Sequence, residues 1–366
     1  MSGGRAADKA MIENCRDPGA ETRTIPIRFM TEMLACASQR GPVDTARALA
    51  TVGLPPDLLG QEGARVTVAQ FGQLYRFLAG TLDDECPGFF SRPLYGGTFK
   101  FLCLNLLNAD NLRVALYRFG QYFRLMLDDL RFELGREDHL GKITIVQLAP
   151  PGPHHVLVHE VMLMLLQGVA SWLVGRRIPF CRAEFAFPTP EYASEYVNIY
   201  PAPVFFDYPR TTYYLELGYL DLPIRQSKST LATFLRNAPM DWIQVAVNEK
   251  RMTHRVRDIL KTQLGFATTI ECAAQGLHLS TRTLARRLEE EGTHFQAVKD
   301  ALRRDVAIAQ ILNTSMSIAS IGAMLGFDDP AAFNRAFRNW TGSPPGSYRR
   351  RGVKPLPADD PAAERD

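Results

Sequence analysis

The chain has 366 residues, enough for two or three domains, and its 46% hydrophobic against 22% charged residues exclude a wholly disordered protein. The net charge of +3 is unevenly distributed: residues 236–351 carry 17 Lys and Arg against 11 Asp and Glu, and the rest of the chain carries 25 against 28. A basic C-terminal third on a slightly acidic body favours a nucleic-acid-binding module joined to a part with another role.

The cysteines and the apolar runs bear on the compartment. Six cysteines, at positions 15, 36, 86, 103, 181 and 272, form no C-x-x-C pair and no regular framework, which favours thiols buried in a reducing cytoplasm. The N-terminus lacks the apolar core and basic flank of a signal peptide. The longest apolar run, residues 161–174, is interrupted by Gln167 and is too short to span a bilayer. We therefore expect a cytoplasmic protein with no membrane partner.

Helical periodicity dominates the first third of the chain. Residues 1–24 are small, polar and charged, and we expect them to be disordered. Apolar spacing predicts helices throughout 25–82, including one over 44–52 after the turn at Gly41. Further helices are predicted over 99–107 and, after Asp110 as the cap, over 112–128. The last of these is rich in aromatic residues, and either faces a core or places some of its rings in a ligand pocket.

Strands follow the aromatic helix. Alternating apolar residues predict them over 131–135, 142–148, 182–187 and 212–217, with a helix over 155–174 after a proline-rich break. Residues 25–222 therefore read as an α+β domain in which helices outnumber strands, and residues 223–239 as a linker. Helices over 242–251 and 253–264 open an all-α domain over 240–350, so the protein as a whole is mainly α. The tail 351–366 is rich in Pro, Ala and acidic residues and is expected to be disordered.

The stretch 317–350 predicts two short helices separated by a tight turn. Ser317 caps the first helix, Gly326 ends it, and Asp328 or Asp329 caps the second. The second helix has apolar residues on one face and basic and amide side chains on the other. This is a helix-turn-helix with a second helix suited to a major groove.

The same pattern occurs once more upstream, over 269–295. Arg286 and Arg335 hold equivalent places on the two second helices. The apolar run 294–312 between the units predicts one helix roughly 28 Å long. That length suits two recognition helices about one DNA turn, roughly 34 Å, apart on one face of the duplex.

These residues resemble a known family. The stretch IASIGAMLGFDDPAAFNRAFRNWTGSPPGSYR is close to the signature of the AraC/XylS transcription regulators, and the resemblance extends over about residues 240–350. One departure is Gly322, where many members have Ala. A glycine there should cost its helix about 1 kcal/mol without changing its role.

The N-terminal body resembles the non-cupin, arabinose-binding-domain-like sensory domain of some AraC-type regulators. The residues that carry this resemblance are the aromatic helix, the Pro-Ala-Pro-Val-Phe-Phe-Asp segment at 201–207 and the Leu-Gly-Tyr-Leu-Asp-Leu-Pro segment at 217–223. The resemblance implies a domain that binds a small effector, dimerises, or does both. It assigns no effector-binding residue.

Candidate DNA-contacting residues lie on the two second helices. Arginine can pair bidentately with guanine, and asparagine with adenine. At each position the side chain either contacts a base, contacts a phosphate or is simply solvated. Base contact is favoured for Arg286, whereas contact with a phosphate or with Glu291 is favoured for Arg287. On the helix between the units, Lys299, Arg303 and Arg304 either reach the DNA backbone or face solvent. The DNA-binding candidates are Arg282, Arg286, Arg287, Asn334, Arg335 and Arg338.

Other chemistry is not indicated. His155 and His159 stand four residues apart, beside His154 and Glu160, but no further ligand follows at metal-binding spacing. No phosphate-binding loop, dinucleotide fingerprint or nucleophile elbow is present. We expect no catalytic residue, metal or cofactor, and no enzyme activity.

The resemblance implies a sequence-specific transcription regulator, with activation as the commoner mode in the family. Its expected partners are double-stranded DNA, a small-molecule effector, RNA polymerase and a second copy of the chain. One alternative is an N-terminal domain that binds only protein partners or dimerises without a ligand. A remote alternative is a cysteine-dependent DNA alkyl-repair regulator. That design needs clustered N-terminal cysteines, whereas Cys15, Cys36 and Cys86 are scattered.

Overall fold

The computed structural model describes residues 23–349 apart from 151, 153, 197–199, 201, 244–251 and 266–267. The chain divides into two compact units. Of the described residues, unit 1 comprises Arg28–Val52 and Val68–Arg255, and unit 2 comprises residues 23–27, Gly53–Thr67 and residues 256–349. The tails expected to be disordered lie outside the described residues, except that Arg23 and Thr24 are described and Thr24 begins a strand.

Unit 1 contains a five-stranded sheet with the order β3-β4-β7-β5-β6, in which only β5 and β6 run parallel. The β3–β4 hairpin turns at Asp138, whose φ of 51° gives the left-handed backbone that a two-residue hairpin loop requires. The strands are β3 Leu130–Glu137, β4 Leu140–Gln147, β5 Arg182–Glu184, β6 Val204–Phe205 and β7 Thr211–Glu216.

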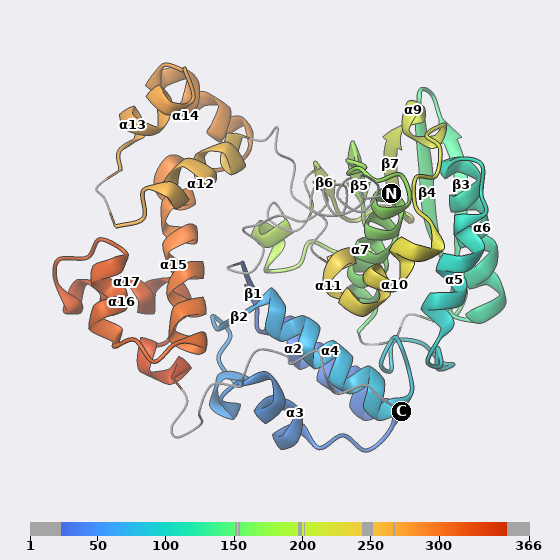
Figure 1. Ribbon diagram of the computed structural model, residues 1–366, viewed down its shortest axis with the longest axis horizontal. Coiled ribbons are helices and arrows are strands. Elements are labelled where there is room, and N and C mark those ends of the chain that lie inside the picture. The colour runs from blue at the N-terminus through green and yellow to red at the C-terminus, as the bar shows by residue number, and fades with distance from the viewer. Residues whose placement is uncertain are drawn as a thin grey trace, which may run out of the picture. The chain divides into compact units, whose positions relative to one another are not determined.

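Helices make up the rest of unit 1 (Figure 1). Most begin and end within a few residues of the prediction, although Asn111 rather than Asp110 caps α6, accepting a hydrogen bond of 3.0 Å from the Val114 N–H. The helices are α2 Arg28–Arg40, α3 Thr45–Val52, α4 Val68–Leu82, α5 Thr98–Leu107, α6 Leu112–Met126, α7 His155–Leu173, α9 Leu217–Leu220, α10 Lys228–Asn237 and α11 Met240–Ile243, with a 3-10 turn at Ala193–Glu195.

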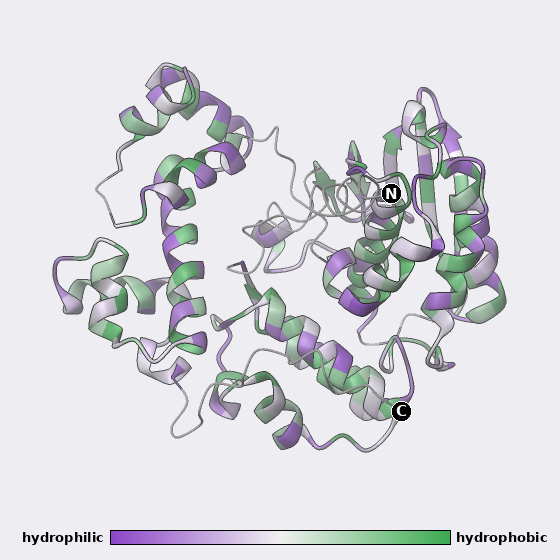
Figure 2. Cartoon of the chain, viewed as in Figure 1, coloured by the Kyte–Doolittle hydropathy of each residue, from purple (hydrophilic) through white to green (hydrophobic). Residues whose placement is uncertain are grey.

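The core of unit 1 gathers around α6 and α7. The aromatic face of α6 packs on β3, with the rings of Phe119 and Phe132 5.1 Å apart, so the predicted core-facing role is confirmed. Figure 2 shows α7 as mostly hydrophobic. By length and composition α7 could cross a membrane, but 89% of its most apolar stretch is buried inside the structure, as in the core helix of a globular domain.

The segment predicted as a linker over 223–239 contains the helix α10, Lys228–Asn237, and belongs to unit 1. α11 lies against both α4 and α7, and each contact occurs at a glycine. A Cβ on Gly72 would come within 2.2 Å of Met240 Sδ, and one on Gly168 within 2.3 Å of Trp242 Cβ. Because the division between the units falls after Arg255, α11 belongs to unit 1, whereas the sequence analysis had assigned residues from 240 onward to the DNA-binding domain. Most of the predicted helix over 242–251 lies outside the described residues.

Unit 2 is a helical body with a small strand pair. β1 and β2 pair antiparallel, although the sequence analysis predicted only helices here. They were missed because three residues are too few to establish an alternating pattern. The elements are β1 Thr24–Pro26, the 3-10 turn Pro56–Leu58, β2 Arg65–Thr67, α12 Met252–Thr262, α13 Ile270–Gly276, α14 Thr281–Glu290, α15 Phe295–Asn313, α16 Ile318–Met324, α17 Pro330–Thr341 and the 3-10 turn Pro345–Tyr348.

Candidate nucleic-acid interface

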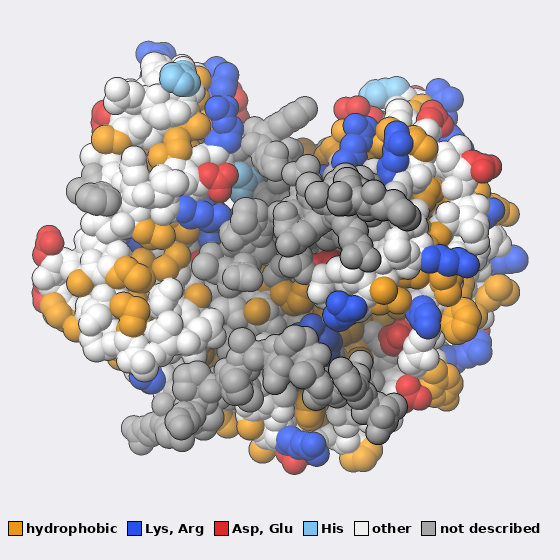
Figure 3. Space-filling model, viewed as in Figure 1, with side chains coloured by type: hydrophobic (Ala, Val, Ile, Leu, Met, Phe, Trp, Pro, Cys, Tyr) orange, Lys and Arg blue, Asp and Glu red, His pale blue; other side chains and the backbone are white. Residues whose placement is uncertain are grey.

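Both predicted helix-turn-helix units form in unit 2, one from α13 and α14 and the other from α16 and α17. The two lie at opposite ends of α15 (Figure 1). In Figure 3, Lys and Arg side chains gather along one edge of the part that contains α12 to α14. Unit 2 thus has two helix-turn-helix units joined by one helix of 19 residues.

Side-chain caps fix where the second helices begin. Ser280 accepts a hydrogen bond of 3.1 Å from the Thr283 N–H at the start of α14. Asp329 accepts bonds of 3.0 and 3.2 Å from Ala331 and Ala332 at the start of α17. These bonds satisfy N–H groups that otherwise have no partner in the first turn of a helix. The predicted Ser280 cap is confirmed, and of the two aspartates proposed for α17 it is Asp329 that serves.

The turn between the helices needs a left-handed residue in both units. Gly326 has φ +79°, and its equivalent in the first unit, His278, has φ +56°. Histidine tolerates this region better than most side chains, but glycine has no Cβ to clash there. The two turns therefore have the same backbone conformation with different residues.

The departure at Gly322 has a structural reason. The buried α16 glycine lies against Phe333 of α17, and a Cβ on it would come within 3.1 Å of the Phe333 Cβ and Cγ. Glycine weakens the helix, but it also allows α16 to approach α17 closely.

On α14, apolar and basic side chains separate to opposite faces. Leu284 and Leu288 are buried, whereas Arg282, Arg286 and Arg287 are exposed. The Arg286 guanidinium forms an ion pair of 2.6 Å with Glu290, which is also exposed. A solvent-exposed pair of this kind contributes little and can open easily.

On α17, Phe333 and Phe337 are buried and Arg338 is exposed. Asn334 is exposed too, and its side-chain amide donates a bond of 2.9 Å to the Pro330 carbonyl, one turn earlier. The Arg335 guanidinium lies 3.9 Å from the Asp329 carboxylate, which also caps the helix. All six candidate side chains are thus on the outer faces of α14 and α17.

The basic residues of α15 are less available than the sequence suggested. Lys299 donates a hydrogen bond of 2.8 Å to the Thr268 carbonyl. The Arg303 guanidinium lies 5.0 Å from the centre of the Phe327 ring, and Arg304 pairs with Asp305 at 3.3 Å. Burial lowers the pKa of Lys299 and of Arg303. These three half-buried side chains make contacts within unit 2.

A buried ionic cluster centres on Asp305 of α15. Its carboxylate accepts a bond of 2.6 Å from Arg257 of α12 and one of 2.5 Å from the Thr24 hydroxyl of β1. Burial raises the pKa of Asp305. The positive charges of Arg257, Arg304 and Arg65 and the Thr24 hydrogen bond lower it by more than burial raises it, so the pKa lies below its ordinary value. The cluster was not predicted, although an aspartate on the apolar face of 294–312 was a signal that could have found it.

Two of the histidines considered for a metal site, His155 and His159, have protein partners. The two ring nitrogens of His159 lie 3.0 Å from the Thr211 hydroxyl and 3.2 Å from the Gln147 side chain. Burial and the nearby His155 lower the pKa of His159 to about 4. A buried neutral histidine that bonds at both nitrogens is a structural residue.

Comparison with known protein families agrees with this architecture. Residues 43–224 match the family described as the arabinose-binding domain of AraC transcription regulators, N-terminal, and residues 273–351 match a helix-turn-helix domain family. The two matches correspond to the sensory and DNA-binding parts expected from the sequence.

Individual proteins are similar as well. The ornithine utilization regulator of Pseudomonas aeruginosa is 26% identical over 326 residues, covering 89% of this chain and 96% of that protein. An uncharacterized HTH-type transcriptional regulator of Mycobacterium tuberculosis is 36% identical over 107 residues, covering 29% of this chain and 31% of its own. The crystal structure of the transcriptional regulator CdpR from Pseudomonas aeruginosa covers 89% of this chain and 98% of its own at 21% identity, with a TM-score of 0.31. With both domain families matched in order, this chain belongs to the AraC family of DNA-binding transcription regulators.

Proposed function

We propose that unit 2 binds two successive major grooves on one face of a duplex, with α14 in one groove and α17 in the next. The observation that carries this proposal is the pair of capped helices with exposed basic faces at the two ends of α15. Recognition helices read bases mainly through their N-terminal halves, and grooves on one face of DNA recur about every 34 Å. Two units on one chain would therefore contact a site that covers two helical turns.

The proposed roles follow from position on each helix. Arg282 and Arg286 lie one turn apart on the exposed face of α14 and read bases, while Arg287 contacts a phosphate. The exposed ion pair of Arg286 with Glu290 would have to open for this contact, at little energetic cost.

On α17 the base-reading role falls to Asn334 and Arg335, with Arg338 on a phosphate. Phosphate contacts fix the register of the protein on the duplex, and base contacts supply the sequence preference.

The remainder of the proposal concerns unit 1. The match over 43–224 supports a sensory domain that binds a small-molecule effector. We also propose that this domain pairs with a second copy of the chain. We place the protein in the cytoplasm. We propose that it is an activator that contacts RNA polymerase and that it acts by binding alone, without a catalytic step. An effector would shift the population of DNA-competent dimers only by as much as its affinities for the two states differ.

Footprinting of the purified full-length protein on the DNA upstream of its own gene tests the proposal. We expect two protected major grooves about 10 base pairs apart within each half-site. Protection of a single groove, or protection that appears equally on random DNA, would contradict the two-groove arrangement. If DNA binding is specific but no small molecule changes it, the alternative of a protein-binding or purely dimerising N-terminal domain gains support.

A further inference from the structure

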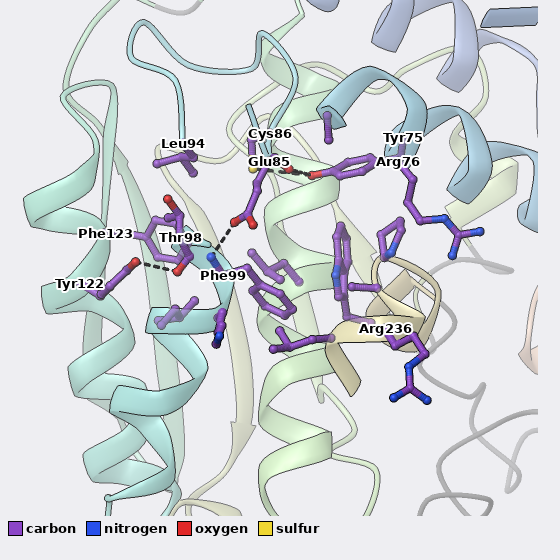
Figure 4. Close-up of a pocket in the computed structure, with 18 residues that line it drawn as sticks. Tyr75, Arg76, Glu85, Cys86, Leu94, Thr98, Phe99, Tyr122, Phe123 and Arg236 are labelled. Atoms are coloured by element: carbon purple, nitrogen blue, oxygen red, sulfur yellow. Dashed lines mark hydrogen bonds between the residues drawn. The ribbon is translucent and has the colours of Figure 1, made fainter. Parts of the chain in front are cut away.

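Unit 1 contains a cavity of about 360 Å³ (Figure 4). Tyr122 and Phe123 of the aromatic helix α6 line it, as one of the two alternatives for that helix predicted. Its volume is at the lower end of the roughly 300–1,000 Å³ typical of small-molecule sites. The walls come from α4, α5, α6, α7 and the α10–α11 segment. Aromatic rings supply much of the lining: Tyr75, Phe99, Tyr122, Phe123 and Trp242.

The ring hydroxyls of this lining are already bonded. The Tyr75 hydroxyl donates to the Glu85 main-chain carbonyl at 2.6 Å, and the Tyr122 hydroxyl donates to the Thr98 carbonyl at 2.7 Å. The edge-to-face packing of Tyr75 on Trp242, with ring centres 5.7 Å apart, fixes both rings. The lining thus offers a ligand mainly aromatic and aliphatic surface.

One carboxylate, that of Glu85, lies in this apolar lining. Its two oxygens accept hydrogen bonds of 2.8 Å from the Gly97 N–H and 2.6 Å from the Phe99 N–H, at the start of α5. No salt bridge to Glu85 is found among the described residues. Burial raises the pKa of Glu85, and the two N–H groups only partly oppose this shift. Each oxygen retains further acceptor capacity.

The basic residues of the cavity are placed differently. Arg76, Lys100 and Arg236 are exposed, and Figure 4 shows the guanidinium groups of Arg76 and Arg236 pointing away from Glu85. Exposed cations are screened by water and hold an anion weakly. A carboxylate inside an apolar wall, in contrast, repels an anion and attracts a cation strongly.

We propose that this cavity binds a small organic cation with an apolar body, whose ammonium group faces the Glu85 carboxylate and whose body packs on the surrounding rings. Faces of Trp and Tyr rings attract cations further, and more strongly when water is excluded. The inference rests on the proposed function, because it supplies the site and the ligand class for the effector. The α10–α11 segment supplies several lining residues, and α12 begins nine residues after α11 ends and crosses the division between the two units.

The test uses full-length protein and three probes that share a phenylalkyl body but differ in head group: 3-phenylpropylamine, 3-phenylpropanol and 3-phenylpropionate. Binding is followed through tryptophan fluorescence, since Trp242 lines the cavity. We expect the amine to bind tightest and the carboxylate weakest. Tightest binding by 3-phenylpropionate, or no binding by any probe at millimolar concentrations, would overturn the proposal.

Variants locate the site. Glu85→Gln should weaken the binding of 3-phenylpropylamine by roughly 10- to 100-fold, the range for losing a charged hydrogen-bond partner. The affinity for 3-phenylpropanol should not change. An unchanged amine affinity in Glu85→Gln would also count against the proposal. Trp242→Phe should remove the fluorescence response while thermal stabilisation by the amine persists. Because Glu85 bonds the first turn of α5, the head-group comparison on the unmodified protein decides the matter if Glu85→Gln does not fold.

Failure of this site and failure of the proposed function give different results. If the probes bind as expected but no footprint forms, the ligand site stands and the DNA-binding proposal falls. If footprinting succeeds and the amine does not bind, the regulator stands and this cavity is not its cation site.

Discussion

The hydroxyl of Thr24 donates a hydrogen bond of 2.5 Å to the carboxylate of Asp305, although the two residues are 281 positions apart. Arg65 of β2 in turn donates to the Thr24 hydroxyl at 2.9 Å, and its own backbone N–H bonds the Tyr348 hydroxyl at 2.9 Å. The strand pair is thus attached at both strands to the helical body of unit 2. The DNA-binding unit of this protein is completed by segments that precede and interrupt the first helices of the chain.

The first prediction concerns Asp305. Asp305→Asn removes the negative charge that Arg257 and Arg304 share, and leaves buried guanidinium groups uncompensated. Breaking a buried pair in this way costs about 3–5 kcal/mol. We expect that loss in the free energy of unfolding measured with urea. Asp300→Asn, on the same helix and outside the cluster, serves as the control and should change stability little.

The Asp305 pKa sets the pH dependence of this contribution. Because the folded-state pKa is below the ordinary value of 3.8, the contribution is complete above that pH and is lost as pH falls through the folded-state value. The difference in stability between the unmodified protein and Asp305→Asn should therefore be constant from neutral pH down to about pH 4 and shrink below it. A difference that grows on acidification would contradict the assignment.

The second prediction compares the two turns. His278→Gly places at φ +56° a residue without the steric penalty, and should raise the free energy of unfolding by about 1 kcal/mol. Gly326→Ala should lower it by at least that amount, because φ is +79° and the new Cβ would lie 3.0 Å from the Gly265 carbonyl oxygen. Opposite signs in thermal or urea unfolding confirm that both positions are left-handed; a loss in both variants would contradict it.

The turns of unit 2 are among the features that could be predicted from the sequence. Glycine, Ser and Asp at fixed offsets predicted the caps and turns of unit 2 because those features depend on local backbone geometry. The sequence did not reveal that α11 packs in unit 1, because an apolar face shows that a helix is buried but not which element it packs against. Gly72 and Gly168, which permit that packing, stand inside helical patterns where a glycine only weakens a helix prediction.

The candidate functional residues also divide into those that the sequence predicted and those that it did not. Exposure of Arg286 and Arg338 followed from helical spacing, whereas for the cavity of unit 1 the sequence offered only the rings of the aromatic helix as an alternative and none of the other walls. Its lining joins residues from Tyr75 to Trp242, brought together only by the tertiary fold. Glu85 carried no local signal, since it is the last of three consecutive acidic residues after a helix, and such a run is typical of a solvated loop.

The third prediction concerns Glu160 of α7, whose carboxyl group accepts hydrogen bonds from Tyr196 and, at 3.1 Å, from Tyr192. Burial raises its pKa from 4.5 to about 8. A raised pKa means that the unfolded chain releases this proton first, so stability is greatest below pH 4.5 and declines by about 1.4 kcal/mol per pH unit up to about pH 8.

Glu160→Gln removes this titration while keeping an oxygen that accepts from the tyrosines. We expect its unfolding free energy to lack the decline, so that the variant becomes the more stable protein as pH rises from 5 to 8 in urea titrations. Glu191→Gln, at an exposed position, is the matched control and should follow the unmodified protein. Parallel pH profiles for Glu160→Gln and the unmodified protein would show that Glu160 is ionised in the fold.

The last prediction separates base reading from phosphate contact. Arg286→Ala should weaken binding to the footprinted site by roughly 5- to 100-fold, the range for one bidentate guanine contact, and change binding to random DNA much less. Arg338→Ala should weaken both alike and reduce the slope of log affinity against log salt by about 0.9. Arg47→Ala, on the exposed surface of α3 in unit 1, should change neither. Fluorescence anisotropy on both duplexes at several salt concentrations distinguishes these outcomes. Equal losses on specific and random DNA for Arg286→Ala and Arg338→Ala would mean that both arginines contact phosphate, and the sequence preference would then have to come from Arg282, Asn334 and Arg335.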